Sequence, residues 1–281
     1  MRARHDQLTP PATGPGASAL PAGGKHALEP DHQTGEAVRL TGVSKAYRTG
    51  RAELLALDGV SLTVRDGEFV CLIGASGCGK STLLNLVAGL DAPTSGLVAT
   101  GGRRVGLMFQ EPALFPWLTA GRNVELALRT RGVPKTARRA QVAELLDTVR
   151  LTGFAEKRPH ELSGGMRQRV ALARALAQDA DVLLMDEPFG ALDAMTRDLL
   201  HDELERICAE RTLTVLFVTH NVREAARLGD RVIVLSSRPG RVVEEYELPR
   251  RGPRRMDSPE VARLAGTLTD RLREEMGLHG N

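Results

Sequence analysis

The chain has 281 residues, of which 42% are hydrophobic and 26% are charged, a composition typical of a folded globular protein with one large domain or two small ones. No stretch approaches the roughly 18 apolar residues that a membrane-spanning helix needs, so we expect any role at a membrane to depend on a partner. The net charge is +3 and aromatic residues make up only 3% of the chain, which leaves few platforms for stacking bases and disfavours nucleic acid as a partner.

The N-terminal segment and the cysteines indicate the cellular compartment of the protein. Residues 1–36 are rich in Pro, Gly and Ala, which bury too little apolar surface to order a backbone, so we expect a disordered tail. The basic start has no apolar stretch behind it and does not resemble a secretory signal. Cys71, Cys78 and Cys208 form no CxxC pair, and their odd number argues against a disulfide framework. A reducing cytoplasm fits this pattern.

Short alternating segments come first in the folded part of the chain. Apolar and polar residues alternate in pieces between Ala37 and Val64, which is typical of strands with one buried face. Turn signals at Asp58-Gly59 and Asp66-Gly67 separate these pieces. The pattern predicts a small antiparallel sheet.

Continuous apolar runs follow and predict strands that are buried on both faces. The first run is 69–73, and a helix is predicted from Lys80 onward. Three similar runs occupy 182–185, 215–218 and 232–235, with helical segments between them. Alternation of buried strands and helices predicts an α/β fold with a parallel sheet.

Two helical regions stand apart from this alternation. Val142, Leu145, Leu146 and Val149 recur at helical spacing within 140–151, and no strand pattern interrupts 119–160, which predicts a helical insertion over about 112–170. A last amphipathic helix is predicted in the tail 249–281. It would begin after Ser258 as N-cap and end at Gly277.

A glycine-rich segment after the first buried strand matches GxxxxGK(S/T). Its glycines allow a tight turn whose N–H groups face a phosphate, and the next helix adds its dipole. Lys80 would reach the β- and γ-phosphates, and the Ser81 hydroxyl would bind Mg²⁺. The alternative is a glycine-rich turn that binds nothing. With the residue that follows, the segment comprises Gly74, Ala75, Ser76, Gly77, Cys78, Gly79, Lys80, Ser81 and Thr82.

Two acids and one histidine lie at the ends of predicted buried strands. Asp186 and Glu187 follow the strand 182–185, at the sheet edge where ligands bind in open α/β folds. Asp186 is suited to hold Mg²⁺, directly or through water, and Glu187 to orient and deprotonate an attacking water. Without the neighbouring phosphate loop, both would read as solvated acids in a loop. His220 follows the strand 215–218, where a lone histidine is more often structural than catalytic.

A second glycine pair indicates the family. The sequence LSGGMRQR at 162–169 precedes a helical stretch and the strand that carries Asp186 and Glu187. It resembles the signature sequence of the ABC ATPase family, and the resemblance covers roughly residues 37–245. Met166 stands where the family usually has Gln, a variant that resembles importer subunits for nitrate, sulfonate and taurine. The chemistry is not affected, because Ser163 and the glycine N–H groups are the phosphate contacts.

The resemblance implies roles for further residues. Tyr47 matches the aromatic residue that stacks on adenine, and Gln110 matches the glutamine that senses Mg²⁺ and water. Asp193 matches a loop that crosses between two subunits, and His220 matches the histidine that contacts the γ-phosphate. The implied cofactors are ATP and Mg²⁺. The implied phosphate contacts of the signature are Ser163, Gly164 and Gly165.

The resemblance also implies an architecture and partners. Residues 37–248 would form a P-loop ATPase core with a small antiparallel β-subdomain and a helical subdomain. Two subunits, either copies of this chain or this chain and a paralogue, would pair head to tail with ATP between them. They would sit peripherally at the cytoplasmic face of the cell membrane, bound to a permease and served indirectly by an extracytoplasmic substrate-binding protein.

The segment 110–119 resembles the importer group for small anions, namely aliphatic sulfonates, taurine and nitrate. Phe115 or Trp117 would suit the groove for a permease coupling helix, or both would pack inside the helical subdomain. The stretch 96–109 is short for this group. Other cargoes, an exporter, a catalytically lost interaction module and a soluble nucleic-acid-associated ATPase are the alternatives. The last type usually has two cassettes or long coiled coils, and this chain shows neither.

Cys78 lies inside the phosphate loop and has two interpretations. It is a small residue that fits the loop, or it is a redox-sensitive thiol whose pKa is lowered by loop N–H groups and Lys80.

Overall fold

The structure is a computed structural model that describes residues 35–49, 52–190, 192–248 and 254–278, and these described residues belong to one compact unit. The predicted disordered tail, 1–36, lies outside the described residues except for its last two positions, and so do 249–253 of the C-terminal segment.

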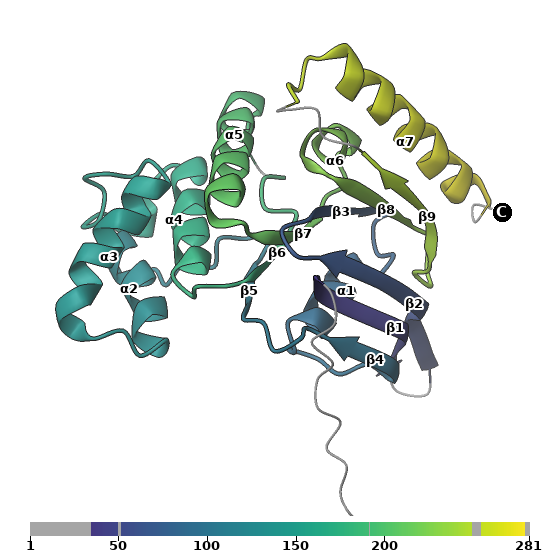
Figure 1. Cartoon of the computed structure of the whole chain (residues 1–281), viewed down its shortest axis with the longest axis horizontal. Helices are drawn as coiled ribbons and strands as arrows, with labels where there is room; N and C mark the ends of the chain where they lie inside the picture. The colour runs from purple at the N-terminus through teal and green to yellow at the C-terminus, as the bar shows by residue number, and fades with distance from the viewer. Residues whose placement is uncertain (1–34, 50–51, 191, 249–253, 279–281) are drawn as a thin grey trace, which may run out of the picture. The chain divides into compact units, whose positions relative to one another are not determined.

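Nine strands and seven helices are distributed along the described residues (Figure 1). The strands are Glu36–Thr49 (β1), Ala52–Arg65 (β2), Phe69–Gly74 (β3), Ser95–Ala99 (β4), Val105–Met108 (β5), Val182–Asp186 (β6), Thr214–Val218 (β7), Arg231–Leu235 (β8) and Val242–Glu247 (β9). The helices are Lys80–Val87 (α1), Ala120–Thr130 (α2), Lys135–Thr148 (α3), Gly164–Leu176 (α4), Ala194–Arg211 (α5), Val222–Leu228 (α6) and Pro259–Leu278 (α7), with one 3-10 turn at Pro159–Glu161 (η1).

The predicted antiparallel sheet is confirmed, in the order β2-β1-β4. Its two long strands have 14 residues each, so the expectation that Asp58-Gly59 separates two strands is wrong. Val43 pairs with Val60 whereas Lys45 pairs with Leu57, so β2 holds one extra residue there. Gly59 has a φ of 61°, which glycine adopts without steric cost. The Asp-Gly signal therefore marks a β-bulge inside β2 rather than a turn.

The second sheet has six strands in the order β5-β6-β7-β3-β8-β9, all parallel except β9. The four predicted buried strands are its centre: β3, β6, β7 and β8. The two edge strands, β5 and β9, do not show continuous apolar runs, because an edge strand is only partly covered and tolerates glycine and charge.

Alternate residues of the central strands face opposite sides of this sheet. Cys71 and Phe217 belong to a core that includes residues of all helices from α2 to α7. Leu72 and Val218 belong to a second core, shared with α1 and the antiparallel sheet. Both faces are covered, which is why the middle of each of these strands is apolar.

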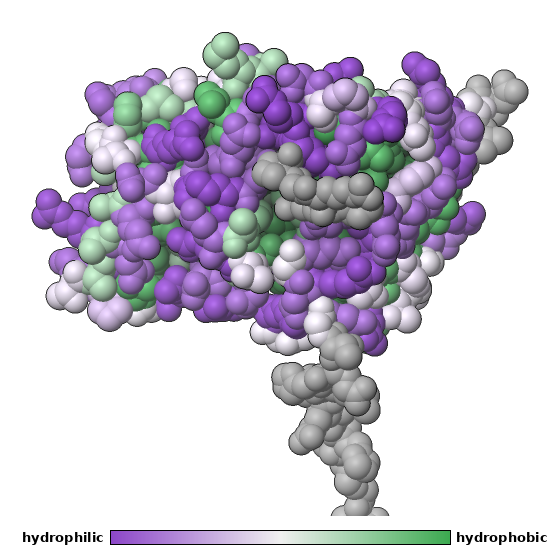
Figure 2. All heavy atoms as spheres, turned by 45° about the horizontal axis from the view of Figure 1, so that its top comes forward, coloured by the Kyte–Doolittle hydropathy of each residue, from purple (hydrophilic) through white to green (hydrophobic). Residues whose placement is uncertain are grey.

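The segment between β5 and β6 contains the helices α2, α3 and α4. α2 and α3 pack against each other and against α4, and the three stand together away from the antiparallel sheet (Figure 1). The fold is therefore the predicted α/β core with a β-subdomain and a helical subdomain. None of the described helices is both long and apolar enough to cross a membrane. The face shown in Figure 2 is mainly hydrophilic, with apolar side chains in small groups.

The C-terminal helix α7 packs against α6. Ser258 caps it, since its Oγ accepts a hydrogen bond from the backbone N of Val261 at 3.2 Å. Val261 and Leu268 are buried, and Arg271 Nε lies 2.9 Å from the Glu244 carboxylate of β9. The helix continues one residue past Gly277, so the predicted end there is wrong by one position.

Candidate active site

The phosphate loop connects the end of β3 to the start of α1. Lys80 is only 6% exposed, and its Nζ donates hydrogen bonds to the carbonyl oxygens of Gly74, at 2.9 Å, and Ala75, at 3.0 Å. Gly79 has a φ of 103°, and a Cβ there would lie 2.8 Å from the carbonyl oxygen of Ala56. Only glycine fits at this position. The loop thus turns tightly into α1 and holds the buried ammonium group of Lys80 beside the N-terminus of that helix.

The carboxylate of Asp186 stands next to this helix start. It ends β6 and shares a hydrogen bond with the Ser81 side chain. Burial raises the pKa of Asp186 above its ordinary value, against the lowering effect of the Ser81 hydrogen bond; the charge of Glu187 raises it further, and Lys80 lowers it.

A hydroxyl oxygen beside a carboxylate is the kind of donor set that Mg²⁺ prefers. Nowhere in the described residues do three or more His, Cys, Asp or Glu side chains gather as a metal cage. Ser81 and Asp186 thus fit an ion such as Mg²⁺, which binds through one or two protein ligands and completes its shell with water and phosphate oxygens.

Glu187 and His220 form a close pair. His220 Nδ1 lies 2.8 Å from Glu187 Oε2, and the backbone N of Glu187 donates to the carbonyl oxygen of Val218 at 2.9 Å. Glu187 has a φ of 43°, an uncommon conformation for a residue other than glycine. Strained backbone of this kind clusters at functional sites, where neighbouring structure holds a side chain in one place.

A cavity of about 390 Å³ joins these elements. Its lining includes six residues of the phosphate loop and α1, together with Tyr47, Gln110 and Glu187, three residues predicted for the site. The Tyr47 hydroxyl donates to Asp91 Oδ2 at 3.0 Å, which fixes one end of the ring. The Gln110 carbonyl oxygen accepts from Gln168 Nε2 at 3.0 Å, which ties that residue to α4.

Arg238 also lines the cavity and was not predicted. Its Nε donates to the carbonyl oxygen of Gly77 at 3.2 Å, so an exposed guanidinium group lies at the phosphate loop. The hairpin that carries Arg238 is held closely, because a Cβ on Gly240 would lie 2.1 Å from the Cys78 carbonyl oxygen. No local sequence pattern predicts this contact, because Arg238 and Gly77 are 161 positions apart in the sequence.

Four predicted site residues lie elsewhere in the chain. Among the described residues that line the cavity, none belongs to the signature segment 163–165, and Asp193 is not one of them. Ser163 caps α4 and Asp193 caps α5. The two caps are neighbours, because a Cβ on Gly165 would lie 2.4 Å from Thr196 Cγ2. Within one chain, therefore, the signature residues do not line the cavity of the phosphate loop.

Cys78 is 1% exposed, and burial raises the pKa of its thiol despite the opposing effect of Lys80. The interpretation as a thiol with a lowered pKa is wrong, because desolvation outweighs the nearby charge. Cys78 is a small residue that fits the loop.

Phe115 and Trp117 lie beside the helical subdomain, with ring centroids 5.4 Å apart. Their exposed fractions are 37% and 68%, so the alternative in which both pack inside the subdomain does not hold for Trp117.

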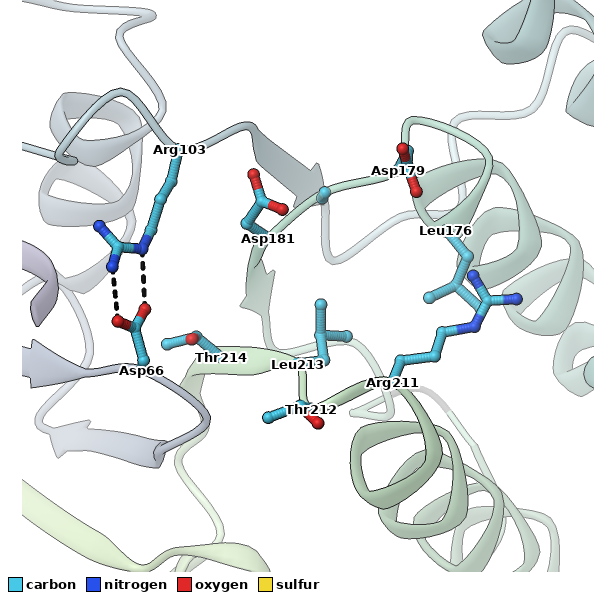
Figure 3. Close-up of a pocket in the computed structure, with 10 residues that line it drawn as sticks. Asp66, Arg103, Leu176, Asp179, Asp181, Arg211, Thr212, Leu213 and Thr214 are labelled. Atoms are coloured by element: carbon cyan, nitrogen blue, oxygen red, sulfur yellow. Dashed lines mark hydrogen bonds and ion pairs between the residues drawn. The ribbon is translucent and has the colours of Figure 1, made fainter. Parts of the chain in front are cut away.

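A larger cavity, of about 600 Å³, opens at the other edge of the parallel sheet, where β6 and β7 begin (Figure 3). Asp66 and Arg103 face each other there as an ion pair. None of the predicted site residues lines it, and we assign the chemistry to the smaller cavity at the phosphate loop.

Comparisons with known proteins show what the chain is similar to. The profile of the ABC transporter family matches residues 57–190. The aliphatic sulfonates import ATP-binding protein of Mesorhizobium japonicum is 47% identical over 236 residues, covering 82% of this chain and 86% of that protein. The nitrate import ATP-binding protein of a Synechocystis species is 46% identical over 218 residues, covering 75% of this chain and 82% of that protein.

A solved structure with the same fold is a dimeric ATP-binding cassette in a post-hydrolysis state, bound to ADP and Pi. The similarity has a TM-score of 0.69 at 37% sequence identity, and it covers 76% of this chain and 99% of that chain.

Proposed function

Because the chain belongs to the ABC transporter family, as an ATPase whose hydrolysis is coupled to transport, we propose that it drives uptake of a small anion: an aliphatic sulfonate, taurine or nitrate. The observation that carries the enzymatic part is the 2.8 Å contact between Glu187 and His220 at the cavity of the phosphate loop. The cargo rests on the names of relatives that are 46% and 47% identical.

The chain's own groups divide the work of hydrolysis. Lys80 and the loop N–H groups bind the β- and γ-phosphates and neutralise charge that develops on them. Mg²⁺, held by Ser81 and Asp186 with Gln110 near it, would supply further charge neutralisation. Glu187 accepts a proton from the attacking water, and His220 fixes the Glu187 carboxylate and contacts the γ-phosphate. Tyr47 stacks on the adenine.

The nucleotide lies between two subunits in this proposal. ATP bound at 74–82 of one subunit meets Ser163, Gly164 and Gly165 of the other, whose helix start presents a second set of N–H groups. Support comes from the absence of the signature residues from the cavity lining within one chain and from the dimeric state of the solved relative. Asp193 then lies at the junction of the subunits. ATP binds the closed dimer more tightly than the open one, and that difference drives the permease.

Membership of the family supports a proposal for the partners. Residues 37–248 form the ATPase domain, which sits peripherally at the cytoplasmic face of the membrane through its permease, and 249–281 is a tail with one helix. The exposed Trp117 is the apolar anchor for a permease helix. An extracytoplasmic binding protein selects the cargo.

Growth of a deletion strain tests the cargo. The strain is grown on taurine or an alkanesulfonate as sole sulfur source and on nitrate as sole nitrogen source, with the native gene or the Glu187→Gln gene restored. We expect loss of growth on one source, recovered only with the native gene. Normal growth of the deletion strain on every source contradicts this cargo class.

A further inference from the structure

A buried carboxylate contacts the residue next to His220. Glu224, on α6, is 4% exposed, and its Oε2 accepts a hydrogen bond from Thr219 Oγ1 at 2.5 Å. Thr219 Oγ1 in turn accepts from the backbone N of Asn221 at 3.0 Å. Both neighbours of His220 are thus fixed through one hydroxyl group that Glu224 orients.

The other oxygen of the same carboxylate faces α5. Glu224 Oε1 lies 3.4 Å from Arg197 Nε and 3.6 Å from His201 Nε2. Arg197 donates to the carbonyl oxygens of Leu192, at 2.7 Å, and Phe189, at 3.3 Å. These two carbonyls belong to the segment that starts at Glu187 and ends at Asp193.

Glu224 therefore connects two loops that are far apart in sequence. One loop carries His220, and the other carries Glu187 and leads to Asp193. His201 is fully buried, Thr219 is 2% exposed and Arg197 is mostly covered, so this connection runs through the interior. Burial raises the pKa of the Glu224 carboxyl, but the close approach of His201, the hydrogen bond from Thr219 and the charge of Arg197 outweigh it, and the net shift is downward.

We propose that Glu224 is a positioning residue for ATP hydrolysis. Through its contacts in the protein interior, it fixes the position of the loop that carries Glu187 relative to the loop that carries His220. It is not among the residues that line the cavity at the phosphate loop. The inference rests on the proposed roles of Glu187 and His220. A displacement of about 1 Å at a catalytic group can lower a rate by roughly 100-fold. We therefore expect the loss of Glu224 to lower the turnover rate rather than the affinity for ATP.

The first test replaces the carboxylate by an amide of the same shape. Glu224→Gln removes the negative charge that faces Arg197 and turns one of the two hydrogen-bond acceptors into a donor. We expect kcat of the full-length chain to fall by about tenfold or more, with KM for ATP changed less than about twofold. Glu203→Gln is the matched control. Glu203 is 1% exposed on the same helix as Arg197, and its Oε2 lies 2.6 Å from Arg150, away from both loops. An equal loss of kcat in the control would overturn the proposal, because burial alone would then explain the effect.

The second test separates positioning from general stability. Thr219→Val removes the hydroxyl and keeps the shape, whereas Thr219→Ser keeps the hydroxyl. We expect Thr219→Val to match Glu224→Gln and Thr219→Ser to recover most of the turnover. In a His220→Ala background, Glu224→Gln should add much less than its effect in the native chain.

The double-mutant cycle of His220→Ala and Glu224→Gln distinguishes a failure of the positioning role from a failure of the proposed function. If His220→Ala lowers kcat but Glu224→Gln costs the same factor with and without His220, the positioning role is wrong and the proposed function stands. If His220→Ala leaves kcat unchanged, the proposed role of the Glu187–His220 pair is wrong, and the positioning role fails with it.

Discussion

Glu187 and His220 follow two neighbouring parallel strands, β6 and β7, and their side chains meet at 2.8 Å. Because the carboxyl ends of parallel strands lie along one edge of the sheet, a short reach from each strand brings the two groups to the phosphate loop after β3. The pairing is thus a consequence of topology, and it places the proposed base beside the groups that would bind the γ-phosphate.

Removal of the Arg238 charge should weaken ATP binding modestly. Its guanidinium group lies at the phosphate loop but is exposed, so we expect Arg238→Ala to cost roughly 1 kcal/mol or less, about fivefold in Kd. Because salt screens exposed charges, the difference from the native chain should shrink at high ionic strength. Equilibrium binding of a fluorescent ATP analogue at low and high salt measures this. Arg104→Ala, at the other sheet edge, is the control. Equal affinities of Arg238→Ala and native chain at low salt would contradict a role in binding.

Mg²⁺ binding should weaken at mildly acidic pH. Burial raises the pKa of Asp186 above its ordinary 3.8, so the proton competes with the metal at a higher pH than for an exposed aspartate. Titration of Mg²⁺ into the chain with ATP, over a series of pH values, should show an apparent affinity that falls as the pH falls toward that raised pKa. An affinity that stays constant until the pH approaches 3.8 would contradict this.

The same raised pKa has a consequence for stability. A carboxyl whose pKa is higher in the folded state contributes stability below its unfolded pKa and loses it as the pH rises through the folded pKa. We therefore expect Asp186→Asn to raise Tm at neutral pH without nucleotide and to abolish the further increase that Mg²⁺ with ATP gives the native chain. Ser258→Ala, at the cap of α7, is a control that should lower Tm and keep the increase. An undiminished Mg²⁺-dependent increase in Asp186→Asn would count against the metal site.

Alkylation should spare Cys78 in the native chain. Its thiol is 1% exposed and burial raises its pKa, whereas Cys208 is partly exposed. Because the thiolate is the reactive form, iodoacetamide at neutral pH should modify Cys208 first and Cys78 only upon unfolding. Peptide mass spectrometry after a time course measures both rates. Rapid labelling of Cys78 with loss of ATPase activity, and protection by ATP, would restore the redox interpretation.

Features set by neighbouring residues in the sequence were predictable. The buried strands, the phosphate loop and the N-cap of α7 each depend on a local pattern, because burial on both faces, a tight turn and a cap all require particular residues at fixed spacing. The bulge at Gly59 was missed because Asp-Gly serves both turns and bulges. Only pairing with β1 decides between them.

Features set by tertiary contacts were not predictable. Arg238 reaches the phosphate loop only because its hairpin packs on Cys78 and Ala56. Glu224 has the sequence context of an ordinary first-turn helix acid, and its proposed role rests on contacts with Thr219 and Arg197. Edge strands β5 and β9 lack the apolar runs that identify the central strands.

Hydrolysis and dimerisation of Glu187→Gln test the central claim most directly. The amide cannot accept the proton of the attacking water, so turnover should fall by about 10²- to 10⁴-fold. ATP binding should persist, because Lys80 and the loop N–H groups are unchanged, and the bound ATP should hold two subunits together. Size-exclusion chromatography with light scattering, in the presence of ATP, measures the state, with Lys80→Ala as the variant that loses binding. We predict an ATP-dependent dimer with almost no turnover; a monomer that hydrolyses ATP at a near-native rate would contradict the account.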